Sequence, residues 1–366
     1  MNFQLINVEN AEYNETETSN LQKTNLSIVI VDMTSSRNVT LENGTVLKKA
    51  DFNWSTKEKG FIISAFFYGY LASPFGGILS VKYGGVVIYG LGIAITGFLT
   101  ILSPFIIRIN IWAYGAIRVL EGIVESFSMA ATPEIFVHWA PQNERSRMIT
   151  CAYAGSMLGA AINYPLSGYI AYIFNWEAVF FFTDFLNIAG ILSLIWFLVW
   201  ILFIKNRPAD DKFICEAEKI YLMSVTQISS IEKKNAPVPW KQIFTSGPVW
   251  AYLNENFCYS WPASFIVLCF PLYIKDVFDI NIKNIGFISS LPLIFGAMGE
   301  ILSACLADFF RSRNIISISN VVCCSILPID MSPQYASILK GFGTTAFAAA
   351  NLLNPTLIGF LVINHV

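Results

Sequence analysis

Charged residues are scarce in this chain. Aspartate, glutamate, lysine and arginine make up 13% of its 366 residues, whereas soluble domains carry about 25%. The net charge of −2, without a clustered basic face, argues against nucleic acid as a partner. The chain also lacks HExxH, GxSxG, P-loop and dinucleotide-binding motifs. We therefore predict neither an enzyme nor a catalytic residue.

Paired cysteines and metal-ligand spacings are lacking too. The seven cysteines are odd in number, and Cys151, Cys258, Cys269 and Cys305 lie inside apolar segments, which favours packing over disulfides or a metal site. His138 stands beside Trp139 at a membrane edge with no second ligand nearby, so it is interpreted as interfacial. No metal and no cofactor is expected.

Apolar residues are abundant. They make up 55% of the chain, and a mean hydropathy of +0.55 predicts an integral membrane protein embedded in a lipid bilayer. Windows of about 20 residues, the length that crosses about 30 Å of hydrocarbon, define eight full spans. They lie at residues 60–81, 85–107, 110–137, 148–173, 177–204, 247–274, 284–309 and 335–363. The stretch LSIVIVDM at 26–33 is long enough for half a helix only.

The longest polar stretch between spans divides the chain into two bundles. We expect a polar tail at 1–23, an N-terminal bundle at 24–204, a cytosolic linker at 205–246 and a C-terminal bundle at 247–366. In the linker, Phe213, Ile214, Ala217, Ile220 and Tyr221 recur at helical spacing and predict a short amphipathic helix.

Orientation follows from glycosylation sequons and basic loops. Asn38, Asn43 and Asn53 each begin an N-x-S/T sequon, which predicts a glycosylated luminal or extracellular loop at about 35–57. Alternating sides from there places the basic turns after residues 81 and 309 in the cytosol, as the positive-inside rule requires.

Three charges lie inside one predicted span, in IRVLEGIVESF at 117–127. Arg118, Glu121 and Glu125 are spaced by three and four residues, so they project from one helix face. A charge at the centre of a span costs about 2.5–3.5 kcal/mol, so this face should point into the bundle. Arg118 can then offer a planar fork to a carboxylate or phosphate, and Glu125, with Glu121, can carry a coupling proton. Alternatively, Arg118 and Glu121 only neutralise each other.

A similar pattern of residues at a helix end occurs in both halves. GGILSVKYGG follows the span at 60–81, and SACLADFFRSR ends the span at 284–309. Each is a small-residue helix end followed by a basic turn, which is typical of the paired repeats of secondary transporters. Two ordinary helix ends are the alternative.

Several motifs occur in an order that resembles the anion/cation symporter branch of the major facilitator superfamily. They are NWSTKEKGFIISAFFYGYLASPFGGILSVKYGG, RVLEGIVES, HWAPQNERSR, VPWKQIFTSGPVWA, NFCYSW, ADFFRSR and DMSPQYASIL, and they cover roughly residues 23–363. The branch includes sialin, sodium/phosphate cotransporters and vesicular glutamate transporters. The resemblance implies an all-α, two-bundle membrane transporter of organic anions or phosphate, driven by proton or sodium symport with alternating access.

The resemblance also implies that segments are missing. Members of the branch have twelve spans, whereas FFRSRNIISISNV leads here through VCCSILPI directly to DMSPQYASILKG. We expect an incomplete fold, with about eight full spans and a partial first span, that lacks the spans corresponding to nine, ten and twelve. Such a shortened chain is not expected to transport alone. The alternative function is a transport-inactive form that binds or regulates full-length paralogues.

The resemblance assigns further site residues. Lys23 stands where members have a basic residue in the first span, and Tyr259 is a candidate hydrogen-bond donor to the substrate. Tyr259 and Ile63 replace an arginine and a histidine of the vesicular glutamate transporters, which favours the sialin and phosphate-transporter side of the branch. Cytosolic gating motifs are expected at Gly77, Lys82, Gly84, Glu144, Arg145, Asp308 and Arg311.

Location and self-association are predicted less narrowly. The branch indicates a plasma membrane or a lysosomal or vesicular membrane. The small-residue segment GFGTTAFAAAN at 341–351 is a surface through which two chains could pack and cover each other's gap.

Overall fold

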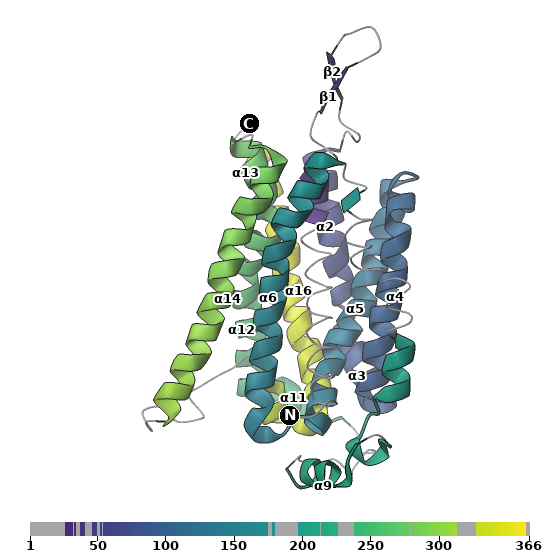
Figure 1. Cartoon of the computed structure of the whole chain (residues 1–366), viewed down its shortest axis with the longest axis vertical. Coiled ribbons are helices and arrows are strands. Elements are labelled where there is room, and N and C mark those ends of the chain that lie inside the picture. The colour runs from purple at the N-terminus through teal and green to yellow at the C-terminus, as the bar shows by residue number, and fades with distance from the viewer. Residues whose placement is uncertain are drawn as a thin grey trace.

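The computed structural model describes residues 26–31, 33, 37–40, 46–49, 52, 54–174, 178–179, 197–212, 214–225, 238–278, 280–312 and 327–363. In this part of the chain, long helices run side by side as a bundle (Figure 1). The hairpin of β1 (Arg37–Thr40) and β2 (Val46–Lys49) projects from one end of the bundle, and α9 (Glu216–Val225) lies at the other (Figure 1).

The N-terminal half contributes five long helices. They are α2 (Thr56–Tyr70), α3 (Ser73–Tyr83), α4 (Gly85–Ile107), α5 (Ile111–Trp139) and α6 (Gln142–Ile173). A capping box starts α2, because the Ser55 backbone N–H donates to the Glu58 carboxylate at 2.7 Å and the Ser55 hydroxyl accepts from the Glu58 N–H at 3.3 Å. Gly84, with a φ of 98°, ends α3 and turns the chain into α4.

The C-terminal half is built around two long helices and one interrupted helix. They are α14 (Ile282–Ser312), α16 (Ala336–Ile363) and the continuous run of α12 (Gly247–Ser264), the π-helical turn η2 (Phe265–Cys269) and α13 (Phe270–Phe278). Short elements precede α12 and α16: α11 (Trp240–Thr245), α15 (Leu327–Met331) and η4 (Pro333–Tyr335).

Side chains from two other helices contact the backbone at and just before the π-helical turn. The Trp261 carbonyl also accepts from the Phe265 N–H, and Pro271, four residues after Val267, has no N–H to donate to the Val267 carbonyl. The Asn354 side-chain amide of α16 donates to the Trp261 carbonyl at 2.5 Å, and the Tyr164 hydroxyl of α6 donates to the Val267 carbonyl at 2.5 Å. Side chains from both halves therefore hold this turn in place.

Glycines allow the two halves to meet closely. On α6 and α14, a methyl group added at Gly168 would approach the Gly286 Cα to 3.2 Å. On α3 and α16, one added at Gly341 would approach the Pro74 Cα to 2.8 Å. The segment 341–351 therefore packs inside the chain, with Ala348 and Ala350 fully buried. Its close packing is thus made within the chain, and pairing of two chains through it stays a prediction.

The expected spans are mostly helical where the structure describes them, but a turn at Leu71 and Ala72 divides the span predicted at 60–81 into α2 and α3. Four helices are long and apolar enough to cross a membrane by length and composition: Lys57–Tyr83, Gly85–Ile107, Gly247–Lys275 and Ile282–Gly299. Among the described helices, α5 is not one of these four, and it carries Arg118, Glu121 and Glu125 in its middle. Of the predicted span 177–204, the structure describes residues 178–179 and 197–204 only.

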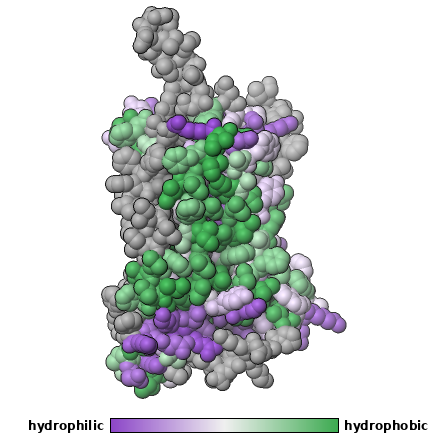
Figure 2. Space-filling view, turned by 90° about the vertical axis from the view of Figure 1, so that its right-hand side faces the viewer, coloured by the Kyte–Doolittle hydropathy of each residue, from purple (hydrophilic) through white to green (hydrophobic). Residues whose placement is uncertain are grey.

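The outer surface suits a lipid environment. Figure 2 shows a broad apolar band over the described surface, with hydrophilic residues gathered at both ends. Phe75, Phe105 and Phe295 are among the large apolar side chains that lie exposed. A monomeric soluble protein rarely exposes so much contiguous apolar surface.

The linker is anchored to the N-terminal half. The Trp139 indole donates to the Lys205 carbonyl at 2.9 Å, and the Val86 N–H donates to the Asn206 side chain at 3.1 Å. The linker then forms η1 (Pro208–Asp210) and α9. Leu222 of α9 is buried.

The predicted linker helix differs from α9 in its start and its packed face. The observed helix α9 begins at Glu216, so Ile214 precedes it, and Phe213 lies outside the described residues. Ile220 and Tyr221 are exposed, because Leu222 takes the packed position.

The strands that the structure describes lie in the predicted glycosylated loop. β1 pairs antiparallel with β2, with Arg37 opposite Lys49. Asn38 lies in β1, whereas Asn43 and Asn53 lie outside the described residues. The hairpin and α9 lie at opposite ends of the bundle, as the predicted orientation requires (Figure 1).

Candidate anion site

One face of α5 places three charged side chains in the interior of the bundle. Relative exposure is 3% for Arg118, 0% for Glu121 and 4% for Glu125. Their spacing puts all three on one face, so the helix cannot bury one of them against α2 and α4 without the others.

Arg118 and Glu121 form a buried ion pair, as one of the two sequence hypotheses required. Arg118 Nη1 lies 2.9 Å from Glu121 Oε2, and Arg118 Nε donates to the Tyr114 hydroxyl at 3.0 Å. Ser103 of α4 donates to Glu121 Oε1 at 3.2 Å. Within the described residues, the structure records no hydrogen bond from Arg118 Nη2. The pair therefore leaves one side of the guanidinium available to a ligand.

Glu125 is bound by a residue that sequence reasoning missed. The buried Tyr70 hydroxyl of α2 donates to Glu125 Oε1 at 2.5 Å. The Tyr70 ring lies 6.5 Å from the Phe347 ring of α16, so Glu125 is connected through Tyr70 to the C-terminal half. The available signal was spacing, because Tyr70 lies two helical turns after Ile63 and shares its face.

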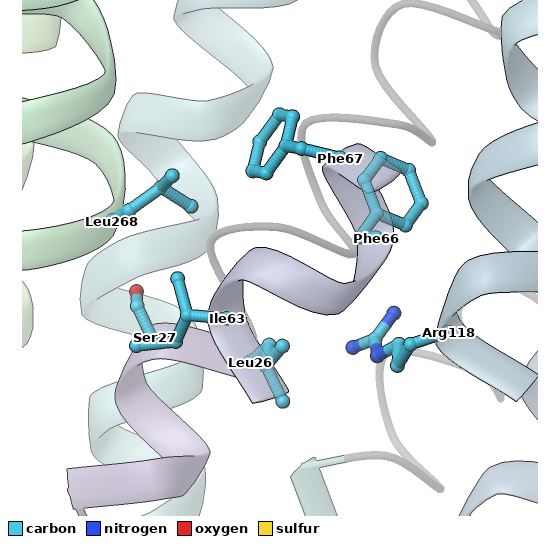
Figure 3. Close-up of a pocket in the computed structure, with 7 residues that line it drawn as sticks. All are labelled: Leu26, Ser27, Ile63, Phe66, Phe67, Arg118 and Leu268. Atoms are coloured by element: carbon cyan, nitrogen blue, oxygen red, sulfur yellow. The ribbon is translucent and has the colours of Figure 1, made fainter. Parts of the chain in front are cut away.

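A small cavity adjoins Arg118 and reaches both halves of the molecule. Figure 3 shows the side chains that surround it. Its lining is Leu26, Ser27, Ile63, Phe66, Phe67, Arg118 and Leu268. The volume open to the centre of a water molecule is about 10 Å³, which is room for about one water. In this conformation the cavity is closed to any organic anion.

The other predicted substrate contacts lie elsewhere. Tyr259 is 51% exposed on α12 and does not line the cavity, contrary to our expectation. Leu268, which lies within the π-helical turn η2 that continues this helix, lines the cavity. Lys23 lies outside the described residues.

The predicted gating residues lie at helix ends and crossings. Gly77 packs against the backbone of Ser337 and Ile338, and Gly84 packs against Asn206. The Lys82 ammonium lies 5.2 Å from the centre of the Tyr83 ring. The four others lie in α6 and α14, with side chains outside the described part: Glu144, Arg145, Asp308 and Arg311.

His138 and two cysteines can also be placed. His138 is buried at the end of α5, with Nε2 3.4 Å from Glu134 Oε1, rather than exposed at an interface. Its burial follows from the packing of the α5 terminus against residues around Ile329. Cys258 and Cys269 are free thiols.

Comparison with known proteins identifies the family. Residues 24–362 match the sequence profile of the Major Facilitator Superfamily, so the chain belongs to this superfamily of membrane transporters. Human sialin is 33% identical over 308 residues, which cover 80% of this chain and 60% of sialin. Zebrafish vesicular glutamate transporter 3 is 30% identical over 386 positions, which cover 92% of this chain and 64% of the relative. These similarities agree with the predicted resemblance to the sialin and vesicular glutamate transporter branch.

Solved structures confirm the fold. The inward-open xylose transporter XylE of E. coli superposes with a TM-score of 0.58 at 8% identity and covers 97% of this chain and 89% of its own. A bacterial homologue of the human lysosomal transporter Spinster gives 0.55 at 13% identity, covering 99% and 80%. At these identities the likeness concerns the fold alone.

The chain spans about 60–64% of the length of these two relatives. The alignment with vesicular glutamate transporter 3 has 386 positions, whereas 92% of 366 residues is about 337. About 49 alignment positions therefore have no counterpart in this chain, in keeping with fewer than twelve spans.

Proposed function

We propose that this chain binds a small organic anion at Arg118 and carries it across a lysosomal, vesicular or plasma membrane by alternating access. The observation that carries the proposal is the buried guanidinium of Arg118, which lines a cavity that both halves of the molecule reach. Rocking of the halves would open this cavity to either side in turn. Inorganic phosphate is the second substrate class that a guanidinium fork suits.

A proton at Glu125 is the proposed coupling ion, with sodium as the alternative. Arg118 contributes one positive charge to the buried face, and ionised Glu121 and Glu125 contribute two negative charges. An anion that enters beside them adds a third, which is unfavourable in a medium of low dielectric constant. Protonation of Glu125 removes one negative charge and makes anion entry easier, so proton and anion should bind together.

A second candidate function is that of a partner that binds anion but does not transport. The roughly 49 relative positions without a counterpart favour it, because alternating access needs two bundles that seal against each other. Uptake and binding must therefore be measured separately.

Replacing Arg118 with Ala is expected to weaken anion binding at least about tenfold, since a charged hydrogen bond contributes about 1.5–3 kcal/mol. Binding of phosphate, sialic acid, glutamate and benzoate to the purified chain in lipid nanodiscs is the measurement. Arg108→Ala, which removes an exposed arginine at the end of α4, is the matched control and should bind normally. Equal binding by both variants would leave the self-neutralising ion pair as the correct interpretation.

Replacing Glu125 with Gln is expected to abolish the dependence of anion binding on pH while binding itself persists, because glutamine mimics the protonated carboxyl. Anion affinity measured between pH 5 and 8 tests this, with Glu216→Gln on the exposed surface of α9 as control. Proteoliposome uptake under separate proton and sodium gradients then distinguishes a transporter from a non-transporting partner. A sodium-dependent affinity that Glu125→Gln leaves intact would contradict proton coupling here.

A further inference from the structure

The cavity beside Arg118 is apolar apart from two groups. In its described lining, Arg118 is the one cation and Ser27 the one hydroxyl-bearing side chain, while the remaining side chains are hydrocarbon. We propose that it selects monocarboxylates with an apolar or aromatic body over dicarboxylates, phosphate and polyhydroxylated acids. This rests on the proposed function of Arg118 and narrows its substrate class.

Charge supports selection of a single carboxylate. Arg118 Nε and Nη1 are already engaged by Tyr114 and Glu121, so the Nη2 side offers one place for an anionic group. A second anionic group on the ligand would lie either against hydrocarbon or towards Glu121 and Glu125. Both positions are unfavourable, because a buried charge needs a partner of opposite sign.

Hydrogen bonding argues against polyhydroxylated ligands. The Tyr70 hydroxyl donates to Glu125 and the Tyr114 hydroxyl accepts from Arg118, so both are already engaged. Each ligand hydroxyl moved from water to the apolar wall would lose hydrogen bonds without replacement. Ser27, the hydroxyl-bearing residue of the lining, is itself hydrogen-bonded to Tyr164.

The apolar wall comes from both halves of the molecule. Ile63, Phe66 and Phe67 lie within about one turn of α2, and the Phe66 and Phe67 rings stand edge to face at 5.6 Å. Leu268 of η2 approaches from the C-terminal half, as Figure 3 shows. A ligand body between them would be covered by hydrocarbon on both sides, with its carboxylate at Nη2.

A matched ligand series tests the proposal on the intact chain in nanodiscs. Labelled hexanoate is the probe, and acetate, butyrate, phenylacetate, adipate, glutamate, sialic acid and phosphate are competitors. Subtracting the hexanoate signal of the Arg118→Ala variant from that of the parent chain removes the contribution of hexanoate that partitions into lipid. Affinity should rise about fourfold per buried methylene from acetate to hexanoate. Adipate, in which a second carboxylate replaces the terminal methyl group of hexanoate, should bind at least about tenfold more weakly than hexanoate.

A wall variant separates this inference from the proposed function. Leu268→Asn should weaken hexanoate binding at least about fivefold and leave acetate binding unchanged, whereas Arg118→Ala should weaken the binding of both. Leu268→Ala serves if the asparagine variant does not fold. Arg118-dependent binding that favours glutamate, sialic acid or phosphate would overturn the monocarboxylate selectivity but keep the proposed function. Absence of Arg118-dependent binding to every anion in the series would overturn both.

Discussion

Gly122→Ala is expected to destabilise the folded chain severely, although it adds a single methyl group. Gly69 of α2 and Gly122 of α5 face each other at a crossing where the two backbones touch. A methyl group on Gly122 would overlap the Phe66 carbonyl oxygen, and one on Gly69 would lie 2.7 Å from the Gly122 carbonyl carbon. Neither obstacle is a flexible side chain, so the helices themselves must separate.

The separation should cost as much as the most severe overpacking. Inserting a methylene into a packed core costs about 1–3 kcal/mol where side chains can move, and the cost should be at the upper end here. α2 carries Tyr70 and α5 carries its partner Glu125, so the 2.5 Å hydrogen bond between them should lengthen as well. We expect lower yield of monodisperse protein, a lower thermal midpoint and loss of hexanoate binding.

Gly299→Ala in α14 is the matched control. No described atom lies within 4 Å of the added methyl group, and alanine favours helix over glycine by about 1 kcal/mol. The control should be neutral or stabilising. If both variants unfold at the same temperature, α2 and α5 do not cross at these glycines.

Glu121→Leu is expected to destabilise the chain by about 3–5 kcal/mol, because it leaves the buried Arg118 guanidinium without a counter-charge. Tyr114 remains as its neutral partner, and the Ser103 hydroxyl loses its acceptor on Glu121. Denaturant titration of the purified chain in mixed micelles measures the loss in the free energy of unfolding.

The double variant Arg118→Met with Glu121→Leu should recover most of that stability. Replacing a whole buried ion pair with hydrocarbon is often neutral, whereas removing one partner is not. The double variant should nevertheless bind no anion, which would show that Arg118 is retained for function rather than for stability. A double variant less stable than Glu121→Leu would mean that the pair stabilises the fold outright.

Local spacing was enough to predict the helices and the charged face of α5. Apolar runs of about 20 residues determine the spans, and spacings of three and four residues put Arg118, Glu121 and Glu125 together without knowledge of the fold. The buried ion pair follows from the same spacing. These predictions succeed because each depends on contacts within one helix.

Contacts between helices could not be predicted in this way. Tyr70 lies 55 positions from Glu125, and Leu268 reaches the cavity from the other half of the chain. Sequence alone marked Tyr259 as the ligand-facing residue of that helix, but the phase of α12 turns it outward. The stripe of small residues in α16 was predicted as a close-packing surface, and within the chain its glycines pack against α3 and α12.

The π-helical turn constrains the number of residues in its helix. It holds one more residue than an α-helical turn would. Two side chains from other helices hold the backbone here: Asn354 binds the Trp261 carbonyl before the turn, and Tyr164 binds the Val267 carbonyl within it. Deleting a single residue from 265–269 would remove the extra residue and close this turn as an ordinary α-helical turn, so α12 and α13 would keep their present faces. A deletion elsewhere in the same helix would instead rotate everything after it by about 100°. Relatives that are one residue shorter in this helix should therefore lack the residue within this turn.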